Sequence, residues 1–298
     1  MATNKETKTA QYLRDTGFTV LVEKKTNVTM STRLTGVLAC MENRASFEPS
    51  VSDHKKRIDE FYTRGAVWCG GTEKQLLADL SGQIDMRPFE EAKQKFQASS
   101  LAVKLREKFE KCQPRRKRCK SEFDGEFNYD RRDDLQPFDG VKRSPSDGRA
   151  IDVIVYGSVS SSTNSKELDA YGNMVWALID IIEQAGVNAR VLIRYQQKGY
   201  LSESNGTLTI NVETKKAGEY IAPSLMAATF KSNFFRRAIF QQIVMGADVV
   251  GEKVGYGLGT PRNAEKKIEF KNGELIIAPE IRNAGFEEIE QELLKAIA

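Results

Sequence analysis

The sequence predicts an α/β protein in two unequal parts: a mainly helical N-terminal part and a C-terminal part in which strands and helices alternate. Apolar residues recur at helical spacing through much of the first 110 residues, and β-rich runs alternate with a long amphipathic segment after residue 148. The chain has 298 residues, of which 40% are hydrophobic and 29% are charged. These values are typical of a globular protein and exclude a fibrous or wholly disordered chain.

The N-terminal region, residues 1–110, is predicted to contain three helices, which the spacing of apolar residues places at Asp53–Arg64, Lys74–Leu80 and Phe89–Cys112. Gly65 and Gly70 bracket residues 66–69, which we interpret as a strand or an extended turn. His54 is the only histidine, and it lies in a polar run typical of an exposed turn or helix start. Because no second histidine is present, we expect no histidine-based metal site or proton relay.

Residues 111–148 form a charged connection, rich in proline and glycine, between the two parts. Residues 111–120 carry six positive charges and no acid, whereas residues 121–140 carry seven acids and two arginines. The whole chain has a net charge of only +4, from 45 basic and 41 acidic residues. The positive character is therefore local.

The C-terminal region, residues 149–298, begins with a predicted βαβ unit. Ile151–Tyr156 predicts a strand, Ser165–Ala185 a helix, and Ala189–Tyr195 a second strand. The usual solution for such a unit is two parallel strands with a right-handed crossover. The remaining predicted elements are a strand at Thr207–Val212, one or two helices within Pro223–Gly246, a hairpin of Lys267–Phe270 and Glu274–Ala278, and a helix at 286–297.

The basic run predicts a negatively charged partner. Six cations within ten residues repel one another, and a polyanion relieves that repulsion while it releases its own condensed counterions. Aromatic side chains beside cations favour unpaired bases, which stack on them. We expect single-stranded DNA to bind a basic and partly aromatic surface made of Arg115, Arg116, Lys117, Arg118, Lys120, Arg190, Arg194, Lys198, Phe235, Arg236, Arg237 and Tyr256. A solvated linker, or a clamp onto the acidic block that follows, is the alternative interpretation of the basic run.

A serine-rich loop, Gly157–Thr163, follows the first strand of the βαβ unit, where α/β sheets place ligands. It resembles the von Willebrand A-type fold, whose metal site has the pattern Asp-x-Ser-x-Ser. Ser158 and Ser160 match the serines, but Tyr156 occupies the acidic position, so we expect no metal there. The resemblance implies a von Willebrand A-like or Rossmann-like C-terminal part. A protein-interaction or assembly module without catalysis is accordingly the alternative function.

No motif indicates catalysis or a cofactor. The glycine-rich segment Gly251–Pro261 lacks the Gly-Lys-Ser/Thr of a Walker A loop and the flanking elements of a dinucleotide-binding fingerprint. A nuclease needs clustered carboxylates around a metal, and the spacing of Asp130, Asp133, Asp134 and Asp152 is not that of a recognisable site. We expect a protein that is not an enzyme and that has no cofactor.

No apolar stretch approaches the roughly 20 residues that cross a bilayer, and the N-terminus has no apolar core of a secretory signal. We therefore expect a cytoplasmic protein without a membrane partner.

Short segments of the chain resemble an uncharacterised family of tailed-bacteriophage proteins, namely Trp68, Gly70-Gly71, Gly172–Gly186 and Phe235–Arg237. The chain as a whole is also similar to the Drc-type single-stranded-DNA-binding cofactors of phage RNA polymerase. This second resemblance implies a viral protein of the host cytoplasm that binds a melted promoter, recruits the phage RNA polymerase and regulates transcription. It implies no particular site residue.

Overall fold

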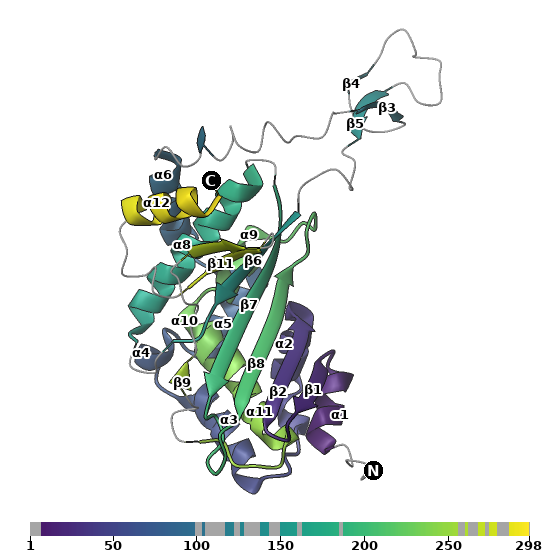
Figure 1. Ribbon diagram of the computed structural model, residues 1–298, viewed down its shortest axis with the longest axis vertical. Helices are drawn as coiled ribbons and strands as arrows, with labels where there is room; N and C mark the ends of the chain where they lie inside the picture. Colours follow the sequence, from purple (N-terminus) through teal and green to yellow (C-terminus); the bar gives the residue numbers. More distant parts are fainter. Residues whose placement is uncertain are drawn as a thin grey trace.

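The computed structural model describes residues 7–98, 103–104, 117–121, 126–127, 138–142, 150–159, 163–184, 187–255, 260–261, 268–271, 274–278 and 286–297 (Figure 1). Within these residues the main feature is a mixed sheet of eight strands, seven in the order β1-β2-β8-β7-β6-β11-β10, with β9 paired to β7. The strands are β1 (Thr19–Glu23), β2 (Asn27–Arg33), β6 (Ala150–Tyr156), β7 (Asn188–Lys198), β8 (Thr207–Lys215), β9 (Thr260–Pro261), β10 (Ile268–Lys271) and β11 (Glu274–Ile277). The predicted α/β class is confirmed.

The predicted βαβ unit is confirmed. Strand β6, helix α8 (Ser165–Gln184) and strand β7 follow one another, and β6 and β7 pair in parallel with Tyr156 opposite Arg194. The predicted hairpin is also present, because β10 and β11 are antiparallel, and β11 then pairs in parallel with β6. The final helix, α12 (Phe286–Ile297), packs against β10.

The N-terminal region supplies two strands that the sequence did not predict. Strands β1 and β2 form an antiparallel hairpin, and β2 pairs in parallel with β8, with Val28 opposite Leu208. The main sheet is therefore built from both the N-terminal and the C-terminal regions.

Helices α3 (Ser52–Thr63), α5 (Glu73–Ala78) and α6 (Arg87–Ala98) lie where three N-terminal helices are predicted. Besides α8 and α12, the structure also contains helices α1 (Lys8–Asp15), α2 (Leu34–Glu42), α4 (Ala66–Cys69), α9 (Pro223–Thr229), α10 (Ser232–Phe234) and α11 (Phe240–Val249). It also contains the π-helical turns η2 (Asp79–Gln83) and η4 (Phe235–Ile239) and a 3-10 turn, η1 (Arg44–Ser46). The interpretation of residues 66–69 as a strand or extended turn is wrong. The Cys69 N–H bonds to the Gly65 carbonyl, which closes a single helical turn, and Gly70 ends that turn with a φ of +80°.

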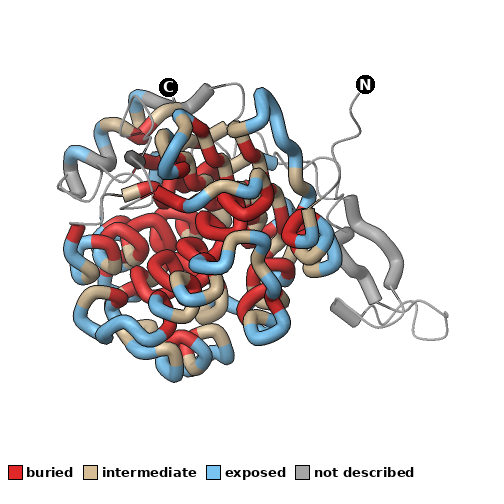
Figure 2. The backbone as a smooth tube through the Cα atoms, turned by 90° about the horizontal axis from the view of Figure 1, so that it is seen from below, coloured by how far each residue is buried: buried red, intermediate tan, exposed pale blue. Residues whose placement is uncertain are grey.

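The part of the sheet formed by β2, β8 and β7 has one buried face and one partly exposed face. Buried and partly exposed residues alternate along β2, β7 and β8, as expected for strands with only one face against the core. In Figure 1 these strands lie in front of helices α2 and α11, and Figure 2 shows the buried backbone concentrated in the interior. We call the partly exposed side the open face, and its residues are Asn27, Thr29, Ser31, Arg33, Arg190, Leu192, Arg194, Gln196, Lys198, Thr207, Thr209, Asn211 and Glu213.

The helical segment from α10 to α11 runs through the core. Every residue from Ser232 to Val249 is buried, including the polar ones. Close packing here requires glycine at position 172 of α8, because a Cβ atom at that position would lie 2.1 Å from the Phe230 carbonyl oxygen. Polar groups in this segment must therefore find their partners inside the protein.

A second, three-stranded sheet lies within the charged connection. Its strands are β3 (Lys117–Ser121), β5 (Phe138–Lys142) and β4 (Glu126–Phe127), in that order. Both pairings are antiparallel, and Lys120 is opposite Asp139. In the part of the chain that the structure covers, no helix has the length and apolar character needed to cross a membrane.

Candidate nucleic-acid interface

A row of polar contacts crosses four strands on one side of the main sheet. Tyr156, Arg194, Asn211 and Ser31 lie opposite one another in neighbouring strands. The Arg194 Nε donates to the Asn211 Oδ1 at 2.9 Å, and the Asn211 Nδ2 donates to the Ser31 Oγ at 3.4 Å. The Arg194 guanidinium carbon lies 6.0 Å from the centre of the Tyr156 ring. Arg194 is thus positioned by the neutral side chains of Asn211 and Tyr156. Neither of them compensates its positive charge.

The neighbouring part of the open face is an ion-pair network. The Arg190 Nε lies 2.7 Å from a Glu213 oxygen, and its Nη1 lies 3.2 Å from an Asp152 oxygen. Arg33 reaches both Glu213, at 3.7 Å, and Glu219, at 2.7 Å. The hydrogen bond that Arg190 donates to Glu213 is the main cause that raises the pKa of Arg190. Arg190, a predicted DNA contact, is therefore neutralised by acids of the protein itself.

Lys198 lies at the end of β7 and is exposed. It is opposite Thr207 of β8, and the next position on the same face, Gln196, is opposite Thr209. Within the residues that the structure describes, neither Arg194 nor Lys198 forms an ion pair with a carboxylate. The open face therefore changes from a neutral network around Arg190 to a positive end around Arg194 and Lys198.

The prediction that Phe235, Arg236 and Arg237 belong to a surface is wrong. These side chains lie in η4 and are 1%, 2% and 1% exposed. Phe235 packs edge-on against Tyr195 with ring centres 5.5 Å apart. The two guanidinium groups donate to backbone carbonyls, which for Arg236 are those of Trp68 and Thr163 and for Arg237 those of Phe61, Tyr62, Arg64 and Gly71.

These contacts bring together Trp68, Gly70-Gly71 and Phe235–Arg237, three of the segments on which the predicted resemblance to a phage family rests. Arg236 stacks on Trp68, with its guanidinium carbon 4.6 Å from the ring centre, and burial lowers the pKa of Arg236. A Cβ atom at Gly70 would lie 2.0 Å from the Ser232 Oγ, so the close approach of the two segments requires glycine there. Trp68, Gly70 and Arg236 therefore pack together at the core.

The basic run lies largely outside the described residues. Arg115, Arg116 and Tyr256 are not described, nor are the side chains of Lys117, Arg118 and Lys120, whose backbone forms part of β3. The register of β3 with β5 places Lys117 opposite Lys142 and Arg118 opposite Val141. Because Arg236 and Arg237 lie in the core, a single groove that includes residues 236–237 together with residues 190–198 does not form.

His54 is buried, contrary to the prediction of an exposed position. It is 1% exposed, its Nδ1 lies 2.8 Å from Asp248 Oδ1, and its Nε2 accepts the Val254 N–H at 3.2 Å. The acceptor role of Nε2 places the proton on Nδ1, which donates to Asp248. Because both ring nitrogens form hydrogen bonds, His54 joins α3 to Asp248 and to the Val254 backbone and has a structural role. The spacing of His54 with Ile58 and Phe61, which is that of one helical face, was the signal for its burial.

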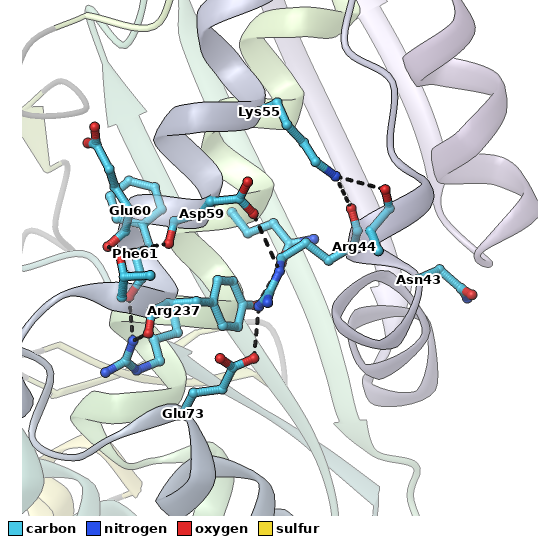
Figure 3. Close-up of polar contacts among 12 residues, drawn as sticks. Asn43, Arg44, Lys55, Asp59, Glu60, Phe61, Glu73 and Arg237 are labelled. Carbon is cyan, nitrogen blue, oxygen red and sulfur yellow. Dashed lines mark hydrogen bonds and ion pairs between the residues drawn. The ribbon is translucent and has the colours of Figure 1, made fainter.

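Other cations of the N-terminal helices also have internal partners, as the close-up in Figure 3 shows. Arg44 lies 2.9 Å from a Glu73 oxygen and 3.7 Å from an Asp59 oxygen, and it stacks over the Tyr62 ring at 3.8 Å. The Lys55 Nζ donates to the Arg44 and Ala45 carbonyls. Arg44 and Lys55 are therefore held by groups of the protein itself.

The serine-rich loop supplies a structural contact. Ser158 is buried, and its Oγ accepts the Gln196 N–H at 2.7 Å. Tyr156, at the position where the von Willebrand A pattern has an acid, is also buried and has an aromatic ring in place of a carboxylate. Considering only the described residues, no group of three histidine, cysteine, aspartate or glutamate side chains is arranged to hold a metal ion.

No curated protein and no solved structure is significantly similar to the chain. One family model matches it, over residues 137–296, which is just over half of the chain and spans β5 to α12. Arg190, Arg194 and Lys198 lie inside the matched range, and β3 lies outside it. The chain belongs to the family described as domain of unknown function DUF7192.

Proposed function

We propose that the protein is a phage single-stranded-DNA-binding protein that acts as a transcription cofactor and has no catalytic activity. The observation that carries the proposal is the positive end of the open face, where Arg194 and Lys198 project from β7 without a described carboxylate partner. An array of strands with one solvated face offers an extended surface on which a flexible single strand can lie. The cations would bind phosphates.

The side chains around these cations suit a sequence-tolerant interface. Gln196, Thr209 and Thr29 form a row of amide and hydroxyl groups across β7, β8 and β2. Such groups commonly donate to phosphate oxygens and so position a strand without reading its bases. We therefore propose binding with little sequence preference.

The basic run and the overall resemblance support the same partner. In β3, Lys117 lies opposite Lys142, so this sheet also places two cationic residues side by side in register. The resemblance to Drc-type cofactors favours a melted promoter as the target and the phage RNA polymerase as a protein partner, in the host cytoplasm.

The first test is fluorescence anisotropy of a labelled single-stranded oligonucleotide with wild type and with Arg194→Ala/Lys198→Ala. We expect wild type to bind and the double variant to bind at least tenfold more weakly at low salt. The slope of log affinity against log salt should fall by about 1.4, at about 0.7 per lost phosphate contact on a single strand. The matched control is Lys56→Ala/Lys74→Ala, which removes two exposed cations from α3 and α5 and should bind as wild type does. Absence of wild-type binding at low salt would refute the proposal.

A second variant tests the basic run alone. Replacing Arg115, Arg116, Lys117 and Arg118 by alanine should reduce the affinity for the oligonucleotide and leave the melting temperature unchanged, because the strands of the main sheet come from other segments of the chain. The measurement is again anisotropy, with a thermal melt as the control for folding. If the affinity does not change, the basic run is a linker.

A von Willebrand A-like or Rossmann-like module for protein interaction or assembly is the second candidate. The parallel β6–α8–β7 unit is compatible with either fold, and the edge strand β1 favours a protein partner. Leu21 and Val22 of β1 are 52% and 41% exposed, and an edge strand with apolar side chains can pair with another chain. A stable partner that is retained in a pull-down after nuclease treatment would favour this function.

A further inference from the structure

The turn between β1 and β2 has an unusual backbone. Lys24 and Lys25 both have positive φ, of 49° and 64°, and among the described residues they are the only non-glycine residues that do. Glycine, asparagine and aspartate adopt this region at lower cost, whereas a lysine side chain crowds its own backbone there. Two consecutive lysines therefore make the turn less stable than glycine or asparagine would at the same positions. Such strain is a reason to look for a function.

The turn is held against the end of the sheet that carries Lys198. The Tyr200 Oη donates to the Thr26 carbonyl at 3.2 Å, and the Thr207 N–H donates to the Asn27 Oδ1 at 3.1 Å. Since Thr207 is opposite Lys198, the turn and Lys198 lie at the same end of the strands. The turns at this end lie side by side at the lower end of the sheet in Figure 1.

Both lysines of the turn are exposed, and neither forms an ion pair with a carboxylate anywhere in the described chain. Strands in a sheet are about 4.8 Å apart, so the turn lies roughly 10–15 Å from Lys198 across β8 and β2. A few nucleotides can span that distance. A single strand that follows the end of the sheet would therefore meet both groups of cations.

We propose that Lys24 and Lys25 form a second phosphate-binding contact for the same single-stranded DNA, and that the strained turn is the cost of projecting two ammonium groups at this end of the open face. This inference rests on the proposed DNA-binding function and extends it to the N-terminal hairpin, outside the matched family range. Glu23, which is exposed and next to the turn, opposes the binding of a polyanion.

The test is the variant Lys24→Asn/Lys25→Gly, which suits the backbone of the turn and removes both charges. We expect a melting temperature about 2–4 °C above wild type, because relief of strain stabilises the folded state. Its affinity for a labelled single-stranded oligonucleotide should fall at least fivefold at low salt, with a salt slope smaller by about 1.4. A gain in stability together with a loss of binding separates a binding role from a structural one.

Two further variants complete the test. Lys24→Arg/Lys25→Arg keeps both charges and should bind as wild type does, and Glu23→Gln should bind more tightly than wild type. If wild type binds but Lys24→Asn/Lys25→Gly binds equally well, the inference about the turn is wrong and the proposed function stands. If wild type does not bind, both are wrong. Tighter binding of an RNA oligonucleotide of the same length would overturn DNA as the partner.

Discussion

Replacement of Asp248 by asparagine should lower the free energy of unfolding by about 3 kcal/mol, because a hydrogen bond to a buried charged group contributes about 1.5–3 kcal/mol. The Asp248 carboxylate is fully buried and accepts the backbone N–H groups of Ser50 and Val51, the Thr9 hydroxyl and the His54 ring. An asparagine amide turns one acceptor into a donor that faces these donors. Urea unfolding at neutral pH measures the loss.

The same contact makes stability depend on pH in acid. Burial alone raises the pKa of Asp248, but the hydrogen bonds from His54, Thr9, Ser50 and Val51 outweigh burial and hold that pKa below its ordinary value of 3.8. The carboxylate therefore stabilises the folded state above pH 3.8, and this contribution is lost as the pH falls through the lower folded-state pKa. Asp248→Asn should remove this part of the acid dependence.

Asp53→Asn is the matched control. Asp53 lies beside His54 in α3, but its side chain is 72% exposed and its ion pair with Lys253 spans 3.7 Å. This variant should unfold close to wild type, because such an exposed pair contributes little. Equal stability of Asp248→Asn and Asp53→Asn would contradict the role assigned to the buried carboxylate.

Arg237→Met should cost on the order of 4 kcal/mol. The methionine fills much of the volume but leaves the carbonyls of Phe61, Tyr62, Arg64 and Gly71 without their donors, and a buried unsatisfied acceptor costs about 1–3 kcal/mol. Arg237→Lys should recover only part of the loss, because an ammonium cannot reproduce the planar fork of five donors. Thermal and urea unfolding measure both variants.

The control is Arg87→Met, since the Arg87 side chain is 85% exposed and pairs with Asp85 at the surface. Its melting curve should overlay that of wild type. If Arg237→Met also melts as wild type does, the buried guanidinium does not hold the end of α3 and the loop between α4 and α5 against η4.

The elements predicted correctly are those that local patterns specify. The run Ile151–Tyr156 and the long amphipathic segment Ser165–Gln184 each fit one period, and Lys271-Asn272-Gly273 marks the β10–β11 turn. The β1–β2 hairpin was missed because its turn has lysines where glycine or asparagine is usual, and because β2 gains its second partner, β8, from a segment 180 residues away in the chain.

The candidate site was predicted only in part, since Arg194 and Lys198 lie on the open face but Arg236 and Arg237 lie in the core. A signal for the latter was present, because the two arginines are flanked on both sides by apolar residues, Phe234 and Phe235 before them and Ala238 to Phe240 after them. Considered without their neighbours, however, two adjacent arginines are typical of an exposed, charged surface.

Neighbouring residues specified the alternation of strands and helices and the class of the fold, because apolar periodicity and turn residues act over a few positions. Which cations face solvent depended on long-range packing. The carbonyl of Phe61 that binds Arg237 is 176 residues away in the chain, and Asn211 that positions Arg194 comes from a different strand. A charge is available to a partner only when folding leaves it hydrated and unpaired, and that depends on atoms brought together from the whole chain.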